Sequence, residues 1–274
     1  MIDPFDYKEP SCALCGGKDF YYPDKDAPIG RIPVSRIIEK LDECYNKNDM
    51  LEAGRLLFYW QEEAKVLKDL QGELTIVNEL LGHLRKTSDL EKGLIAIDRA
   101  LFLIEFLDKT ESVSSATIYL NVATTLKALG KAEKALPIFD KAFSIYSKDI
   151  ETNKPLLSGF YNNKALALVD LKDYDGALEC YNLALENLKF TDRELVDGAI
   201  TFVNMAHLYD ALKNKQKTVD SLFSAFDLLN NEQNEHNGYY AYVLSKCAPS
   251  FRQFGYDKIA DDFEKLSGEI YERT

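Results

Sequence analysis

"NVATTLKALGKAEKALPIFDKAF", residues 121–143, has two close counterparts further along the chain. Residues 163–185 read "NKALALVDLKDYDGALECYNLAL", and residues 204–226 read "NMAHLYDALKNKQKTVDSLFSAF". Each stretch begins with Asn, and Ala follows two residues later. Near its end each has a large apolar residue and, three positions on, Ala: Phe139 with Ala142, Tyr181 with Ala184, and Leu222 with Ala225. A recurrence every 41–42 residues predicts a repeat protein whose units stack on one another.

The same register extends in both directions from these stretches. Stepping back 42 residues from Ala135 reaches Gly93, and Ala53 lies 40 residues before Gly93. Going forward, Ala248 lies 42 residues after Ala206. We therefore expect six units, which begin near residues 34, 74, 116, 158, 199 and 241.

Each unit has the pattern of two helices joined by a turn. In the third unit, apolar residues recur every three or four positions along one helical face, at Ile118, Val122, Leu126 and Leu129. Gly130 then suits the left-handed position that ends a helix. A second stripe alternates small and large residues, so that helix backbones approach at Ala135 and Ala142 while Phe139 fills the space between them. The pattern predicts an all-α protein.

Proline divides the chain into two parts. Five of the eight prolines lie in the first 33 residues, and proline disrupts helix interiors. We expect residues 1–33 to form an irregular N-terminal arm and residues 34–274 to form the helical repeats. The last unit is expected to end the stack with a polar outer face, since Glu264 and Ser267 occupy its apolar and small slots.

These residues resemble the tetratricopeptide repeat. In the third unit the signature small and large residues of that family stand at Ala123, Leu126, Gly130, Ala135, Phe139 and Ala142, although the fourth unit has Lys172 in place of the turn glycine. The resemblance covers about 240 of the 274 residues, and the period of 41–42 is similar to the long repeats of kinesin light chains and of bacterial peptide-sensing proteins. It implies a right-handed superhelical solenoid of about six helix-turn-helix repeats. In that family, the first helix of each repeat lines a concave groove.

Composition excludes several classes of partner. The formal net charge is −12, whereas a nucleic-acid-binding protein needs a basic surface, so we expect no nucleic-acid partner. No uncharged run approaches the roughly 18 residues of a membrane span, and the acidic N-terminus lacks the features of a secretory signal, so no membrane partner is expected. Five cysteines at scattered spacing do not form a disulfide framework. We therefore expect a cytoplasmic protein with reduced thiols.

Asparagines at matched slots point to a binding surface. Asn121, Asn163 and Asn204 occupy the same position in successive units, and Asn78 lies near it in the second unit. A carboxamide both donates and accepts hydrogen bonds, so a row of them suits the backbone of an extended peptide. The alternative is that each Asn only bridges to the adjacent helix. The candidate surface is completed by five further residues on the same face, which are Lys127, Leu166, Asp170, His207 and Asp210.

The predicted function is therefore a protein-interaction module that holds a peptide or partner protein in its groove. Self-association is an alternative, because the aromatic-rich stretches 56–60 and 238–242 suit a homodimer interface. An enzyme is not expected, since no nucleophile elbow, phosphate loop or zinc-protease motif is present. His207 and Asp210 lie three residues apart on one predicted helix, but the sequence shows no nucleophile or metal beside them.

Cys12 and Cys15 form the one motif that stands outside the repeats. The sequence "CALCGG" resembles a zinc knuckle, but structural zinc takes four ligands and the arm offers two thiols, which make a half site. We expect no cofactor; zinc completed by acidic residues or by a second subunit is the alternative. The favoured interpretation is that Phe20, Tyr21 and Tyr22 pack over the first repeat as an N-terminal cap.

Overall fold

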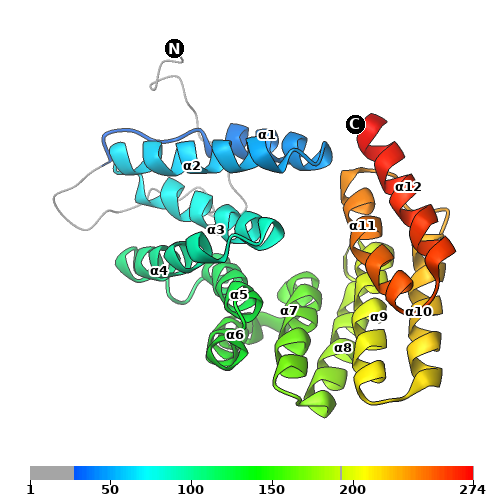
Figure 1. Cartoon of the computed structure of the whole chain (residues 1–274). Helices are drawn as coiled ribbons and strands as arrows, with labels where there is room; N and C mark the ends of the chain where they lie inside the picture. Colours follow the sequence, from blue (N-terminus) through cyan, green and yellow to red (C-terminus); the bar gives the residue numbers. More distant parts are fainter. Residues whose placement is uncertain (1–27, 192, 274) are drawn as a thin grey trace. The chain divides into compact units, whose positions relative to one another are not determined.

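A computed structural model describes residues 28–191 and 193–273 of the chain (Figure 1). Within these residues the chain forms twelve α-helices and one 3-10 helix, and no strand. The prediction of an all-α protein is confirmed. The helices, in chain order, are α1 (Val34–Asn46), α2 (Met50–Val66), α3 (Leu70–Thr87), α4 (Leu90–Phe106), α5 (Val113–Ala128), α6 (Ala132–Tyr146), η1 (Ser147–Asp149), α7 (Ile150–Asp170), α8 (Tyr174–Leu188), α9 (Glu194–Ala211), α10 (Lys215–Leu229), α11 (Gly238–Gln253) and α12 (Asp257–Arg273).

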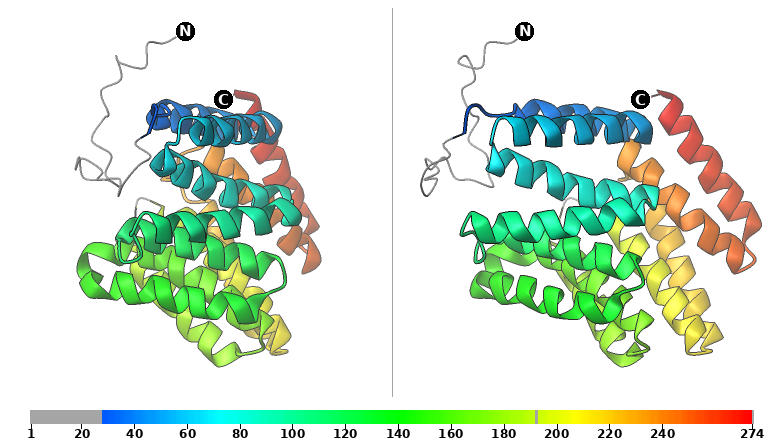
Figure 2. Two further views of the ribbon diagram at one scale, coloured as in Figure 1. Left: turned by 90° about the vertical axis from the view of Figure 1, so that its left-hand side faces the viewer. Right: turned by 60° about the vertical axis from the view of Figure 1, so that its left-hand side comes forward.

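The helices belong to two compact units. Of the described residues, 28–44 and 49–146 form the first unit, and 45–48, 147–191 and 193–273 form the second. In the first unit, α3 packs against α4 and α5 against α6; in the second, α7 packs against α8, α9 against α10, and α11 against α12 (Figure 2). The sequence predicted the helix pairs but indicated no division of the repeats after Tyr146.

The second helices carry the alternation of small and large residues that the sequence predicted. Ala135, Phe139 and Ala142 on α6 are fully buried. The equivalent residues of α8, which are Ala177, Tyr181 and Ala184, are also fully buried. On α10, Leu222 and Ala225 are buried in the same slots, and Thr218 takes the place of the first alanine. Thr218 is accommodated because its hydroxyl donates to the backbone oxygen of Asn214, 3.0 Å away.

One turn geometry recurs between the two helices of every repeat. The first or second residue after the first helix has a positive φ at six places, which are Asn48, Ser88, Gly130, Lys172, Lys213 and Gly255. The next residue is Asp or Asn in four of these turns, and its side chain accepts a hydrogen bond from a backbone N–H three residues later, which caps the second helix. Lys172 thus takes the conformation that glycine takes in the third repeat, at φ 63° against 68° for Gly130.

This shared conformation makes opposite predictions for two substitutions. Lys172→Gly is expected to raise the free energy of unfolding, and Gly130→Ala to lower it, each by about 1 kcal/mol, because a side chain disfavours the left-handed region. A Cβ at Gly130 would meet nothing within 4 Å, so the loss is purely conformational. Gly159→Ala is the matched control: it also meets nothing, but it lies inside α7, where alanine stabilises a helix. Urea unfolding measures all three changes, and a loss of stability in Gly159→Ala equal to that in Gly130→Ala would contradict the argument.

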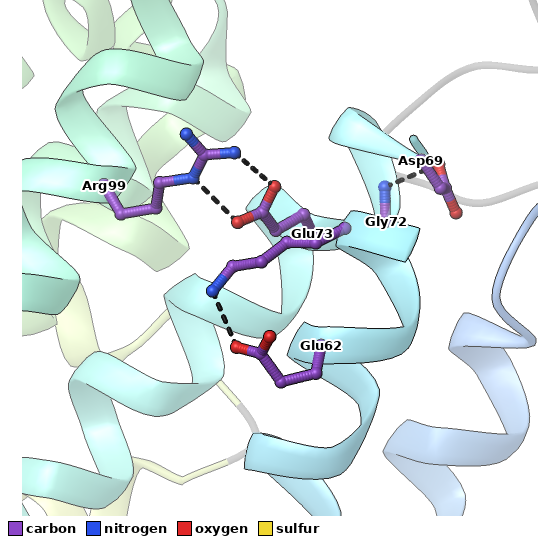
Figure 3. Close-up of polar contacts among 6 residues, drawn as sticks. Glu62, Asp69, Gly72, Glu73 and Arg99 are labelled. Carbon is purple, nitrogen blue, oxygen red and sulfur yellow. Dashed lines mark hydrogen bonds and ion pairs between the residues drawn. The ribbon is translucent and has the colours of Figure 1, made fainter. Parts of the chain in front are cut away.

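A buried ion pair joins α3 to α4 (Figure 3). Glu73 is fully buried, and Arg99 holds it with two hydrogen bonds, Nε to Oε1 at 2.7 Å and Nη2 to Oε2 at 2.6 Å. Asp69, at the start of α3, accepts hydrogen bonds from the backbone N–H groups of Gly72 and Ile32, both at 3.0 Å. Asp69 therefore caps α3 and also fastens the segment that precedes α1.

The final helix departs from the sequence-based expectation at one residue. Glu264 is exposed, as expected of an outer face, and pairs with Arg252 at 2.7 Å. Ser267 was expected on the same polar face but is buried, and its hydroxyl donates to the backbone oxygen of Ala241 at 2.7 Å. The small serine fits a close helix contact because α11 supplies a carbonyl partner for its hydroxyl.

Candidate binding surface on the first helices

All nine residues of the predicted binding surface lie on first helices of the repeats. In the first unit, Asn78 lies on α3, and Asn121 and Lys127 lie on α5. In the second unit the surface is formed by residues of α7 and α9, which are Asn163, Leu166, Asp170, Asn204, His207 and Asp210. Each unit therefore presents its own part of the surface.

In the first unit, the asparagines of neighbouring repeats are joined directly. Nδ2 of Asn121 donates to Oδ1 of Asn78 at 2.8 Å. Arg85 of α3 donates to the backbone oxygen and to Oδ1 of Asn121, at 3.3 and 3.4 Å. Asn78 in turn donates to Glu79 at 3.3 Å. Burial raises the pKa of Glu79, and the hydrogen bond from Asn78 opposes that shift. These contacts fasten α3 to α5 through polar groups.

In the second unit, the residue that pairs across the repeats is one position away from the predicted one. Nδ2 of Asn204 donates to Oδ1 of Asn162 at 3.2 Å, whereas Nδ2 of Asn163 donates to the backbone oxygen of Gly159 in its own helix, at 2.7 Å. Sequence reasoning missed Asn162. The exact 42-residue step from Asn121 leads to Asn163, which is why that residue was predicted. The signal that could have found Asn162 is that two asparagines stand side by side at this position.

These amides keep hydrogen-bonding capacity after their contacts within the protein are made. All three are half-buried, so solvent reaches them. In the part of the chain that the structure describes, no hydrogen bond is made by Oδ1 of Asn204, Nδ2 of Asn162 or Oδ1 of Asn163. The surface of α7 and α9 therefore offers both an amide donor and amide acceptors to a ligand.

His207 bridges α9 to α11. Its Nε2 lies 2.8 Å from the hydroxyl of Ser250, and its ring centroid lies 5.1 Å from that of Phe254. Burial lowers the pKa of His207, and the negative charge of Asp210 opposes that shift. The lowered pKa favours the neutral form of the ring.

The contact between Ser250 and His207 places a hydroxyl beside a base, which the sequence did not indicate. Acyl transfer also needs N–H donors directed at the oxyanion that forms beside the serine. Ser250 lies inside α11, where backbone N–H groups are bonded to carbonyls of the preceding turn. The geometry fits a bridge between helices better than a catalytic site.

The described residues contain no group of three or more His, Cys, Asp and Glu side chains that could hold a metal ion. Cys12 and Cys15, and the arm residues Phe20, Tyr21 and Tyr22, lie outside the described residues. None of the described helices is long and apolar enough to cross a bilayer.

Comparison with known proteins identifies the repeats. Residues 114–189, which span α5 to the end of α8, match the family model of the tetratricopeptide repeat. This part of the chain, from α5 to α8, therefore has the sequence of the tetratricopeptide repeat. The match covers the third and fourth repeats, in which the sequence pattern is clearest. The helix pairs on either side share the recurring turn conformation and the buried core positions of these repeats.

Two solved structures with TM-scores above 0.5 share the fold at low sequence identity. A Rap protein complexed with Competence and Sporulation Factor is 16% identical, with a TM-score of 0.62; the match covers 89% of this chain and 65% of that one. NprR in complex with its cognate peptide NprX is 14% identical, with a TM-score of 0.57, and 88% and 71% of the two chains are covered. A putative kinesin light chain of Podosopora anserina is 13% identical, with a TM-score of 0.48 and coverage of 72% and 94%. Among curated proteins, none matches the sequence.

Proposed function

We propose that this tetratricopeptide-repeat protein binds an extended peptide, or an extended segment of a partner protein, on the first helices of its repeats. Asn162 and Asn204 pair across the repeats of the second unit and Asn163 lies beside them, and these amides retain hydrogen-bonding groups that nothing in the described chain uses. That observation carries the proposal, because the peptide backbone offers matching N–H and C=O groups whatever its side chains are.

Two fold relatives support the peptide as the class of ligand. The Rap protein and NprR were both solved with a bound factor or peptide, and both share the helical repeat fold of this chain. Their sequence identity of 14–16% supports the comparison of folds alone, so the peptide that this chain binds follows from its own residues. Asp170 and Asp210 of the second unit would place negative charge beside the bound backbone.

A matched pair of asparagines tests the proposal. Asn163 on α7 and Asn187 on α8 make the same contact, from Nδ2 to the backbone oxygen four residues earlier, at 2.7 and 2.8 Å. They differ in that α7 is a first helix and α8 a second helix. Replacement of either by Ala removes one similar intrahelical bond, so the two variants are expected to have similar stability. They are expected to differ in binding.

Peptides selected from a random displayed library on the wild-type chain serve as the probe, and fluorescence anisotropy gives their Kd. We expect Asn163→Ala to weaken binding roughly tenfold, since a lost hydrogen bond costs about 1 kcal/mol or slightly more, and Asn187→Ala to leave Kd unchanged. N-methylation of single peptide bonds should weaken binding at the positions that face the amides. Failure to enrich any peptide, or equal Kd values for the two variants, would exclude this surface.

A further inference from the structure

The second helices of the first unit expose an apolar face. Tyr59 and Val66 on α2 are 56% and 68% exposed, and Ile95, Phe102 and Phe106 on α4 are 65%, 49% and 52% exposed. The two helices occupy equivalent places in successive repeats 40 residues apart, so that Val66 corresponds to Phe106. Phe102 and Phe106 stack at 5.6 Å between ring centroids. We call these five residues the α2–α4 face.

The equivalent slots of the next repeat are polar. Stepping on by 42 residues from Phe102 and Phe106 reaches Ser144 on α6 and Lys148 on η1, and a further 42 residues reaches Glu186 and the exposed Phe190. Helix α12 carries no exposed large apolar residue. A repeat stack needs a cap at each end. The last helix is polar outside, whereas α2 and α4 of the first unit together expose the five large apolar residues of the α2–α4 face, and burial of such aromatics is favourable.

The N-terminal segment leaves the first unit beside this face. The backbone N–H of Ile29 donates to the oxygen of Leu67, immediately after Val66, at 2.8 Å. Lys109, just beyond Phe106, bonds the side chain of Gln71 at the start of α3. Residue 28, the end of α2 and the end of α4 therefore lie at the same edge of the unit, and Ile29 at that edge is 73% exposed.

We infer that residues 1–27 cover the α2–α4 face, with Phe20, Tyr21 and Tyr22 against Phe102, Phe106 and Val66. The three aromatic residues precede residue 28 by six to eight positions, which reach roughly 20–28 Å when extended. Helix α4, with 17 residues, is about 25 Å long, so the aromatic residues reach both phenylalanines.

Charges of both signs lie on the segment and at the edge that it leaves. The segment holds six acidic and three basic residues, and Asp19 and Asp24 flank the three aromatic residues. The edge carries Lys65, Lys68 and Lys109 among the acidic residues Glu63, Glu105 and Asp108, and Lys65 pairs with Glu62 at 2.7 Å. Because the face belongs to second helices, this cap leaves the peptide-binding surface of the first helices open, and the inference stands independently of the proposed function.

Energy transfer in the full-length protein tests the inference. Trp60 of α2 is the single tryptophan and serves as donor, and a thiol-reactive acceptor on Cys15 of a Cys12→Ser chain reports the arm. The three cysteines of the described chain, Cys44, Cys180 and Cys247, are buried, so the native fold protects them from the label.

We expect strong transfer that does not depend on protein concentration. It should fall several-fold in a Phe20→Ser, Tyr21→Ser, Tyr22→Ser variant and in a Phe102→Ser, Phe106→Ser variant, and it should persist in Phe190→Ser, which removes a 50% exposed aromatic residue from the second unit. Circular dichroism checks that each variant is folded. Weak transfer that neither variant changes would overturn the inference. Transfer that rises with concentration together with a dimeric mass would assign the face to a second copy instead.

Discussion

Arg99→Met is expected to lower the free energy of unfolding by about 3 kcal/mol, since it leaves the carboxylate of Glu73 buried without its cation. Glu73 is fully buried and receives two hydrogen bonds from Arg99. We place the loss at the low end of the usual range because the Arg99 side chain is 31% exposed, so solvent reaches part of the pair. Methionine keeps an unbranched apolar side chain at this position but also loses the contact of the guanidinium with the Phe102 ring, 5.0 Å from Cζ to the ring centroid. Urea unfolding measures the loss.

Two further variants separate burial from charge. Arg252→Met removes an arginine that pairs with three carboxylates, those of Asp257, Asp261 and Glu264, but these side chains are 70%, 66% and 51% exposed, so we expect little loss. Replacing Glu73 and Arg99 together by Met should recover most of the stability, because no uncompensated charge remains. Equal losses in Arg99→Met and Arg252→Met would contradict this account of the α3–α4 contact.

Phe139→Ala is expected to cost about 3–5 kcal/mol, because it opens a cavity in the core of the first unit. Phe139 is fully buried on α6, and the two alanines beside it in the stripe, Ala135 and Ala142, are too small to fill the space. Since each repeat contacts only its neighbours, the loss should appear as faster hydrogen exchange in α5 and α6.

The control for this core variant is an aromatic residue in the second unit. Phe190 is 50% exposed, so Phe190→Ala should cost about 1 kcal/mol or less. Thermal and urea unfolding of the two variants compare them directly. A loss in Phe139→Ala no larger than that in Phe190→Ala would show that the repeat register is misassigned.

The fold was predictable because its determinants are local and recur. The alternation of Ala135, Phe139 and Ala142 depends only on helical spacing, and the same slots of α8 are buried in the structure. Gly130 was predicted as a helix end and has the expected positive φ. Lys172 and Lys213 adopt the same conformation without glycine, so the turn is imposed by the helices that it joins as well as by its own residue.

The candidate site was predictable only to the level of the helix face. Repeat spacing placed the asparagines on the first helices, but a step of one residue turns a helical side chain by about 100°, which spacing of 41–42 residues does not resolve. The structure selects Asn162 as the partner of Asn204 and adds the Ser250 contact of His207, both across repeats. These pairs depend on how neighbouring helices are rotated against each other.

The sequence by itself determined that this chain is a stack of helix pairs, because small and large apolar residues at a fixed period can be buried together in one way only. Tertiary structure alone decided which polar residues meet inside that stack. Glu73 and Arg99 lie 26 residues apart, Ser267 bonds a carbonyl of another helix, and Asn204 bonds an amide 42 residues earlier. Such contacts carry no periodic signal, since a polar side chain finds its partner only after apolar packing has set the distance and rotation between the helices.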